Sequence, residues 1–378
     1  MELLVFSLFA AALLVCVIFH ISLLFALLLG YVIFALYAIR KGFSLPEVLG
    51  MSAQGVRAAK NILTTFVLIG ILTSLWRAGG TIPAIVCYSV RVMEPRLFLV
   101  CSFLLNCLVS FLTGTAFGSA ATMGAVCMTM AAALGADPLM TGGAILSGVY
   151  FGDRCSPVST SALLVADLTG TDLFGNIRQM LRTCLVPFAL AAGLYLLFGL
   201  SSPAAGQAAD IAPLFALEFR LGPLPLIPAA LILVLSALRV RVKAAMLASI
   251  AAAAVLCLAY QGAAPLTLLK DAVLGFSAQS PELATMIDGG GIVSMLQVGA
   301  IVCLSSSYSG IFQRTGLLEP IRRRIEAWGA VLSPYAAVLV TSVLASAIAC
   351  NQTLSIMLTH QLCGGLEKSR EKLAIYLE

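Results

Sequence analysis

Residues 3–38 read LLVFSLFAAALLVCVIFHISLLFALLLGYVIFALYA and contain no acidic or basic side chain other than His20. A single helix over this run would measure about 54 Å, whereas the hydrocarbon core of a bilayer is about 30 Å thick. Two antiparallel helices, joined near residues 20–22, fit that thickness. The N-terminal run therefore predicts a hairpin of membrane-spanning helices.

The composition extends this interpretation to the whole chain. Of the 378 residues, 61% are hydrophobic and only 10% are charged, and the mean hydropathy is +1.05. A soluble domain carries about 25% charged residues, so this chain has too few polar side chains to cover a water-facing surface. Lipid admits only helices and closed barrels, and runs such as 97–111 lack the alternation of a barrel strand. The sequence predicts an all-α, polytopic transmembrane helix bundle.

Apolar segments recur along the chain between polar or glycine-rich stretches. They lie at residues 62–76, 97–113, 117–134, 141–151, 176–200, 224–238, 244–260, 292–312 and 334–349. Two stretches rich in Pro, Gly and Ala, residues 201–223 and 261–291, are expected to be loops.

The basic residues give an expected orientation. Lys and Arg concentrate in cytoplasmic loops, and placing residues 40–60 in the cytoplasm also places most of the other basic loops there. We therefore expect a multi-pass protein of the cell membrane with a cytoplasmic N-terminus. Arg77, Arg91 and Arg96 form an exception on the opposite side.

Two regions of the chain resemble one another. Residues 62–124 and 292–361 each contain an apolar helix, a turn with Gly and Pro, and a second apolar helix interrupted by a polar run. By the count of crossings, the first copy begins in the cytoplasm and the second begins outside. This pattern predicts inverted-topology repeats with broken, partly unwound membrane helices, an architecture of many secondary transporters.

The repeats suggest a division of the chain into four parts. Residues 1–61 are expected to form an N-terminal helical hairpin and a basic cytoplasmic segment. Residues 62–200 are expected to form the first transport repeat, and residues 201–291 a linker of helices and loops. Residues 292–378 then form a second, incomplete inverted repeat.

The first polar break is residues 113–122, TGTAFGSAAT. Gly114 and Gly118 weaken the helix, and a broken helix offers free carbonyls to a cation and a half-helix N-terminus to an anion. Thr115 and Ser119 add hydroxyl groups, which makes them candidate binding residues. In the second copy the corresponding candidates are Asn351 and Gln352. Close helix packing through small residues is the alternative interpretation.

The second polar break is residues 148–161, GVYFGDRCSPVSTS. A carboxylate at membrane depth costs about 2.5–3.5 kcal/mol on insertion scales, so Asp153 is expected to face a cavity or a partner. Gly152 and Pro157 mark an unwound segment, because Pro lacks an N–H and disfavours helix at the residue before it. The hydroxyl groups that complete the candidate site belong to Ser156, Ser159 and Thr160.

A carboxylate in a low dielectric holds its proton more readily than in water, so it can exchange the proton for a metal cation. This makes Asp153 the candidate ligand of a transported cation. The alternative is a structural pair of Asp153 with Arg154 near a membrane surface. Asp167 is a further candidate at membrane depth, and Asp172 is expected to cap the following helix. The cysteines sit singly and form no CxxC, so no cofactor and no resident metal are expected.

These motifs resemble those of a known family. Residues 114–120, GTAFGSA, are similar to the Gly-Thr-Ser-Trp-Gly-Thr signature of the NhaC-type sodium/proton antiporter family, and residues 150–157, YFGDRCSP, resemble its Phe-Gly-Asp-Lys-x-Ser-Pro block. The resemblance implies sodium/proton antiport, or proton- or sodium-coupled exchange of a small carboxylate such as malate or lactate. It also implies ion-binding roles for Asp153, Ser156, Thr115 and Ser119.

The chain departs from that family pattern in two places. Many members continue with Ser-Asp-Thr-Thr where this chain has residues 159–162, STSA, so one intramembrane carboxylate is missing. The spacing from Thr115 to Asp153, applied to Asn351, places the mirrored site beyond Glu378. A chain shorter than a complete transporter is therefore expected, and an inactive or regulatory homologue is one alternative.

Other functions are less compatible with the sequence. A channel would show conductance without counter-ion coupling. An intramembrane aspartyl protease would need Gly-x-Gly-Asp and a second aspartate motif, but Tyr150 replaces the first glycine. We therefore expect no enzyme activity and no nucleic-acid partner. The expected partners are sodium ions, protons or a small organic anion, and membrane lipid, and a homodimer is left open.

Overall fold

The computed structural model describes residues 2–201, 212–238, 240–317, 319, 322–325, 327, 333–349 and 352–378. Within them the regular structure is helical, apart from one isolated bridge between Phe276 and Gly289. The chain forms two compact units. Unit 1 comprises Met1–Thr64, Leu163–Asn176 and Leu296–Glu378, and unit 2 comprises Thr65–Ala162 and Ile177–Met295. The predicted all-α fold is confirmed.

The described helices divide between the units as follows. Unit 1 contains α1 (Glu2–Ile18), α2 (Leu23–Arg40), α3 (Leu45–Ala58), α18 (Leu296–Thr315), α20 (Pro334–Ala349), α21 (Gln352–Cys363) and α22 (Arg370–Leu377). Unit 2 contains α5 (Thr81–Val92), α6 (Phe98–Thr113), α7 (Ala116–Ser119), α8 (Ala125–Leu134), α9 (Pro138–Cys155), α12 (Ala212–Glu218), α13 (Ile227–Ala237), α14 (Val242–Val255), α15 (Pro265–Leu274), α16 (Pro281–Ile287) and α17 (Gly291–Ser294). Helices α4 (Lys60–Ala78), α10 (Thr160–Thr169) and α11 (Leu173–Ser201) contain residues of both units.

Several of these helices have the length and composition of membrane spans. Among the described residues, six helical stretches are long and apolar enough to cross a bilayer: Leu23–Arg40, Lys60–Ala78, Pro95–Thr113, Ala116–Leu134, Leu173–Ser201 and Val242–Tyr260. Helix α11 has a large exposed apolar surface, on which Leu185, Val186 and Leu190 are each more than 60% exposed. Lipid is the solvent that suits such a surface. An exposed apolar surface of this extent does not occur on ordinary water-soluble monomers. The protein is therefore a multi-pass membrane protein.

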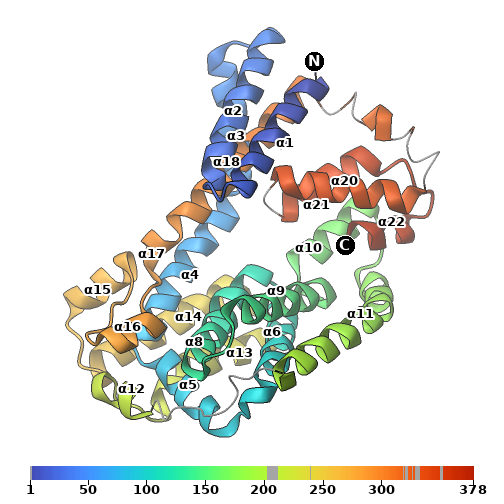
Figure 1. The fold of residues 1–378 in the computed structure, drawn as a ribbon. Coiled ribbons are helices and arrows are strands. Elements are labelled where there is room, and N and C mark those ends of the chain that lie inside the picture. Colours follow the sequence, from blue (N-terminus) through green and yellow to red (C-terminus); the bar gives the residue numbers. More distant parts are fainter. Residues whose placement is uncertain are drawn as a thin grey trace. The chain divides into compact units, whose positions relative to one another are not determined.

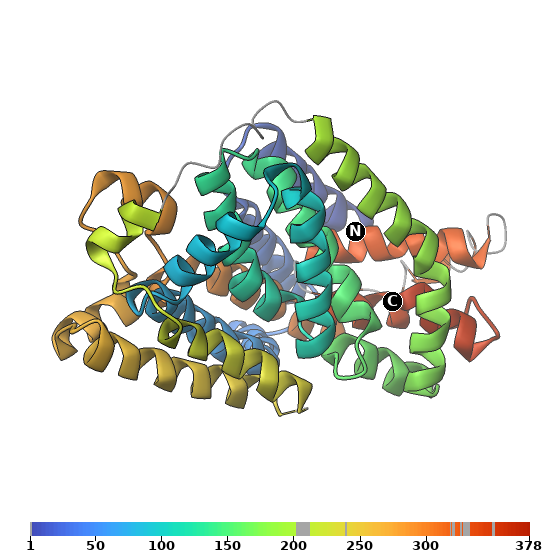
Figure 2. The same cartoon turned by 90° about the horizontal axis from the view of Figure 1, so that it is seen from below.

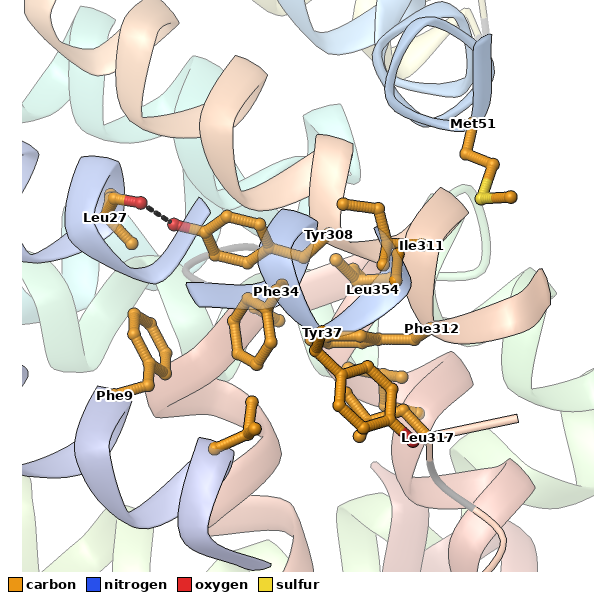
Figure 3. Packing of buried hydrophobic residues seen from close by; sticks show 14 of the residues in the cluster. Phe9, Leu27, Phe34, Tyr37, Met51, Tyr308, Ile311, Phe312, Leu317 and Leu354 are labelled. Atoms are coloured by element: carbon orange, nitrogen blue, oxygen red, sulfur yellow. Dashed lines mark hydrogen bonds between the residues drawn. The ribbon is translucent and has the colours of Figure 1, made fainter. Parts of the chain in front are cut away.

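Unit 1 is organised around an aromatic cluster between α1, α2 and α18. The ring of Phe34 packs against the rings of Tyr308 and Phe312, with centroids 5.1 and 4.8 Å away, and Phe9 completes the group (Figure 3). The Tyr308 hydroxyl donates a hydrogen bond to the Leu27 carbonyl. This bond matters because a buried hydroxyl without a partner is costly in an apolar core.

Helices α3 and α18 approach one another through glycine. A Cβ atom on Gly55 would collide with the Ser306 carbonyl oxygen, and one on Gly310 would collide with the Met51 carbonyl oxygen. Figure 1 shows the two helices side by side. Such small-residue contacts are typical of helix association in membranes.

Unit 2 is built around the pairing of α6 with α9. Gly148 and Gly152 of α9 face the α6 backbone, and a Cβ atom on Gly152 would lie 2.7 Å from the Phe111 nitrogen. The Ser110 hydroxyl of α6 donates to the Val149 carbonyl at 2.6 Å. Figure 2 shows α13 and α14, in the yellow part of the colour scale, as a second pair of adjacent helices in this unit. The α6–α9 pair holds both predicted helix breaks.

Two helices meet near residues 20–22 as expected, since α1 ends at Ile18 and α2 begins at Leu23. That both helices span the membrane stays a prediction. The loop predicted over residues 261–291 is partly wrong. It contains α15 and α16, which begin at Pro265 and Pro281, because Pro is well suited to the first helical position. Helix α12 likewise falls within the loop predicted over residues 201–223.

The inverted repeat remains a prediction. Both expected copies share an order of elements: a helix, a glycine at positive φ (Gly80 at 78° and Gly316 at 64°), and further helices. The first copy has its break at Gly114. The break expected at Asn351 lies outside the described residues.

Candidate functional site

The first helix break follows directly from one glycine. Helix α6 ends at Thr113 because Gly114 adopts a left-handed conformation with φ 63°. Thr115 is extended and caps α7, and its hydroxyl accepts the Gly118 N–H at 3.3 Å. Ser119 donates to the Thr115 carbonyl at 2.8 Å, and its hydroxyl also lies 2.8 Å from that of Thr113. The break therefore gathers the hydroxyl groups of Thr113, Thr115 and Ser119. The binding role of Thr115 and Ser119 stays a prediction.

The chain beyond this break is not regular α-helix. Residues Ala120–Gly124 form a π-helical turn, η2, before α8 begins. A π-helical turn widens the helix and is frequent at functional sites. The Thr122 hydroxyl bridges this turn by donating to the Gly118 carbonyl at 2.8 Å.

The second break is produced by Pro157, as predicted. Helix α9 ends at Cys155, and Ser156 is extended with ψ 131° because a following proline disfavours the helical conformation. The Ser156 hydroxyl is buried and accepts the Val158 N–H at 3.3 Å. Helix α10 then begins at Thr160.

Asp153 lies in the last turn of α9 and is only 4% exposed. The Ser161 hydroxyl donates to its Oδ2 at 3.3 Å, and the Ser159 and Ser161 hydroxyls lie 2.8 Å apart. Its other oxygen, Oδ1, has no hydrogen-bond partner in the described part of the chain. Asp153 forms no ion pair with Arg154 or with any other described side chain. The structural pairing considered from the sequence is therefore absent.

The two breaks meet within unit 2. A Cβ atom on Gly114 would lie 2.6 Å from the Val158 carbonyl carbon, so only glycine allows the first break to approach the second. The backbone N–H of Ala116, in the first turn of α7, lies near the Asp153 carboxyl. The motifs at residues 113–122 and 148–161 thus meet beside Asp153.

Not every candidate residue joins this site. Thr160 is exposed at the start of α10. Asp167 is exposed in the part of α10 that belongs to unit 1, and Gln352 is half-buried at the start of α21 in unit 1. Asn351 lies outside the described residues. Asp172 caps α11 as predicted, because its Oδ2 accepts the Gly175 N–H at 2.7 Å.

Two participants were not singled out from the sequence, Ser161 and Thr113. Ser161 lies two residues after Ser159 in the run that follows Pro157, and it is Ser161 rather than Thr160 that donates to Asp153. Whether the hydroxyl of Thr160 or that of Ser161 points toward Asp153 depends on the residue at which α10 begins. A correct prediction of that first helical residue could have identified Ser161.

The chemistry of the site suits a small cation. One carboxylate, hydroxyl oxygens and the carbonyls of a broken helix are hard oxygen ligands, which alkali and alkaline-earth cations prefer. The described residues contain no group of three or more His, Cys, Asp or Glu side chains that could hold a metal ion.

Comparison with known families decides the classification. The Na+/H+ antiporter family matches residues 1–166 and 148–372, which together span nearly the whole chain. The chain belongs to the Na+/H+ antiporter family. This confirms the family to which residues 114–120 and 150–157 showed a resemblance.

The matched part of this chain spans 65% to 75% of the length of three curated relatives. The chain is 29% identical to the Na+/H+ antiporter NhaC of Alkalihalophilus pseudofirmus over 354 residues, which are 90% of this chain and 74% of the relative. It is 27% identical to the malate-2H+/Na+-lactate antiporter of Bacillus subtilis over 361 residues, 92% and 75% of the two chains. It is 26% identical to the arginine/ornithine antiporter ArcD of Halobacterium salinarum over 323 residues, 82% and 65% of the two chains. No solved structure matches this antiporter.

Proposed function

We propose that this antiporter exchanges sodium ions for protons and that Asp153 is the group that carries both. The observation behind the proposal is a buried carboxyl whose Oδ1 has no partner among the described residues, at the junction of two helix breaks. A charge at membrane depth is costly unless it is neutralised. Either a proton or a sodium ion neutralises the Asp153 carboxylate, but the two do not bind at the same time.

Competition for one carboxylate couples the two ions when the site opens to one side of the membrane at a time. When sodium binds, the proton leaves, and when the proton returns, sodium is released. The hydroxyls of Ser159 and Ser161 and those of Thr115 and Ser119 supply neutral oxygens that replace part of the hydration shell of sodium. The names of the NhaC relatives and of the malate/lactate antiporter both specify sodium and protons, which supports these two ions as the coupled pair.

The same proposal includes an orientation. The N-terminus lies in the cytoplasm, the protein resides in the plasma membrane, and the basic residues of 40–60 face inward. A cysteine-accessibility assay with a membrane-impermeant reagent in intact cells tests this arrangement. A single cysteine introduced within residues 41–44 should not react with this reagent. Labelling of that cysteine in intact cells would contradict the cytoplasmic placement.

The test of the exchange activity uses purified protein in proteoliposomes with a pH-sensitive dye inside. Adding sodium outside should change the internal pH in a saturable way, and Asp153→Asn should abolish the change. Asp137→Asn is the matched control. Asp137 caps the same helix by accepting the Leu139 N–H at 2.7 Å, and Asn caps helices about as well as Asp. Full sodium-dependent exchange by Asp153→Asn would contradict the proposal.

A further inference from the structure

Arg77 is a charged side chain that the cation site does not use. It lies in the last turn of α4, in unit 2, and its Nη1 donates to the Thr73 carbonyl at 3.0 Å. Its Nε is buried and has no hydrogen-bond partner among the described residues. A buried N–H of a guanidinium group without an acceptor is costly, so an acceptor is expected to occupy this place at some stage.

Arg77 lines a cavity of about 610 Å³ within unit 2. The walls come from η2 and α8, from the first half of α9 and from α16. Most of the lining is apolar or small, as at Gly124, Met128 and Ile145, and Thr129 and Thr285 add hydroxyl groups. Ligand pockets for small molecules are commonly about 300–1,000 Å³, largely apolar and furnished with few polar groups.

Among the described residues, Arg77 forms no ion pair that would neutralise the positive charge of this cavity. The carboxylate of Asp288 acts on Arg77 electrostatically. Asp288 is exposed, and its Oδ1 accepts the Ala278 N–H at 2.7 Å while its Oδ2 accepts the Ser277 hydroxyl at 3.1 Å. Asp288 is therefore held by its own loop.

We propose that the Arg77 cavity binds a small organic carboxylate. The guanidinium group recognises a carboxylate through charge-assisted hydrogen bonds, and the apolar walls accommodate a short carbon chain. Lactate and malate have this chemistry and are small enough for the cavity. Arg77 would then be a substrate-binding residue.

This inference rests on the proposed exchange at Asp153 and adds a second cargo to it. Helix α9 connects the two sites, because Ile145 lines the cavity and Asp153 lies eight residues further along. Eight residues of α-helix span about 12 Å. A bound anion in the same unit stabilises a positive charge on the Asp153 site, proton or sodium, over the empty carboxylate, which links carboxylate binding to cation occupancy.

Isothermal titration calorimetry tests this site on the full chain in phosphatidylcholine nanodiscs, with L-lactate and L-malate as probes in the presence of sodium. Arg77→Gln should weaken carboxylate binding by about tenfold or more. Gly142→Leu is the second variant. Gly142 lines the cavity, and a Cβ atom there meets no atom within 4 Å, so leucine should fill the space without a clash.

Two controls accompany these variants. Arg220→Gln removes an exposed arginine of unit 2 that donates to the Tyr260 carbonyl at 3.2 Å and does not line the cavity. Gly143→Ala replaces the neighbouring glycine of α9, where a Cβ atom would be in ordinary contact with the Tyr195 hydroxyl at 3.5 Å. Both should bind the probes as the wild type does.

Unchanged carboxylate affinity in Arg77→Gln and Gly142→Leu would overturn the proposal. Absence of carboxylate binding by the wild type would overturn it as well, and a repeat in phosphatidylglycerol nanodiscs would show whether a lipid headgroup occupies the cavity instead. Sodium-dependent proton exchange is measured on the same preparations. A wild type that exchanges ions but binds no carboxylate contradicts only the anion site, whereas exchange by Asp153→Asn contradicts the proposed function.

Discussion

Gly114 packs directly against the backbone of Val158, with no room for a side chain between them. This contact brings the break after α6 against the break after α9. It places the hydroxyl groups of the first motif and the carboxyl of the second in one part of unit 2. The close approach of these two residues brings two separate sequence motifs together beside Asp153.

Gly114→Ala should disrupt this arrangement. A left-handed alanine costs about 1–2 kcal/mol, and the added methyl group also meets Val158. We expect a loss of about 3 kcal/mol of stability and a loss of sodium-dependent exchange. Gly135→Ala is a close control, because Gly135 has the same φ of 63° and no atom within 4 Å of a Cβ. Thermal unfolding of the purified variants measures the difference, and equal effects of both substitutions would contradict the importance of the contact.

Gly152→Ala should separate α6 from α9. The new methyl group would collide with the Cys107 carbonyl oxygen and lie 2.7 Å from both the Phe111 nitrogen and the Ser110 Cβ. Because two of these three atoms belong to the backbone, the helices have to move apart, and overpacking of this kind costs about 1–3 kcal/mol. Exchange activity and thermal stability should both fall, whereas Gly143→Ala on the same helix should preserve them. A Gly152→Ala variant as stable and active as the wild type would show that this packing is adaptable.

Ser161→Ala should weaken sodium binding without unfolding the protein. It removes the hydroxyl that donates to Asp153 Oδ2 at 3.3 Å and that lies 2.8 Å from the Ser159 hydroxyl. Loss of one hydrogen bond to a charged group costs about 1.5–3 kcal/mol, so the sodium concentration for half-maximal exchange should rise about tenfold or more. Ser147→Ala, which removes an exposed serine of α9, is the comparison. If the two variants have the same half-maximal concentration, Ser161 does not contribute to the site.

Tyr308→Phe tests the aromatic cluster of unit 1. The substitution keeps the ring contacts with Phe34 and removes the hydrogen bond to the Leu27 carbonyl. We expect a loss of about 1 kcal/mol of stability, measured by thermal unfolding. Tyr335→Phe, on an exposed tyrosine, should have no such effect. A Tyr308→Phe protein with wild-type stability would mean that the hydroxyl adds nothing to the cluster.

The sequence predicted well those elements whose ends are determined by one or two neighbouring residues. A glycine after Thr113 and a proline at position 157 end helices wherever the chain folds, so both breaks could be located. The class of fold followed from a composition that only lipid can solvate. Ser280-Pro281-Glu282 carries the signal of a helix start, since Ser280 accepts the Leu283 N–H at 3.3 Å, but the glycines around it favoured a loop.

The remaining features depend on contacts between distant residues. The meeting of Gly114 with Val158 and the burial of the Arg77 Nε arise from packing, which spacing along the chain does not encode. The inward orientation of Ser161 instead of Thr160 depends on one residue at the start of α10. The motifs therefore indicated the chemistry of the site, and the fold determined which hydroxyl groups take part.

The most direct test of Asp153 as the shared carrier is the release of protons when sodium binds. Sodium chloride is added to purified, detergent-solubilised protein in a weakly buffered solution with a pH-indicator dye, with choline chloride as the control salt. We expect the wild type and Asp137→Asn to release protons in a saturable way and Asp153→Asn to release none. Proton release by Asp153→Asn equal to that of the wild type would contradict competition of sodium and protons for this carboxyl.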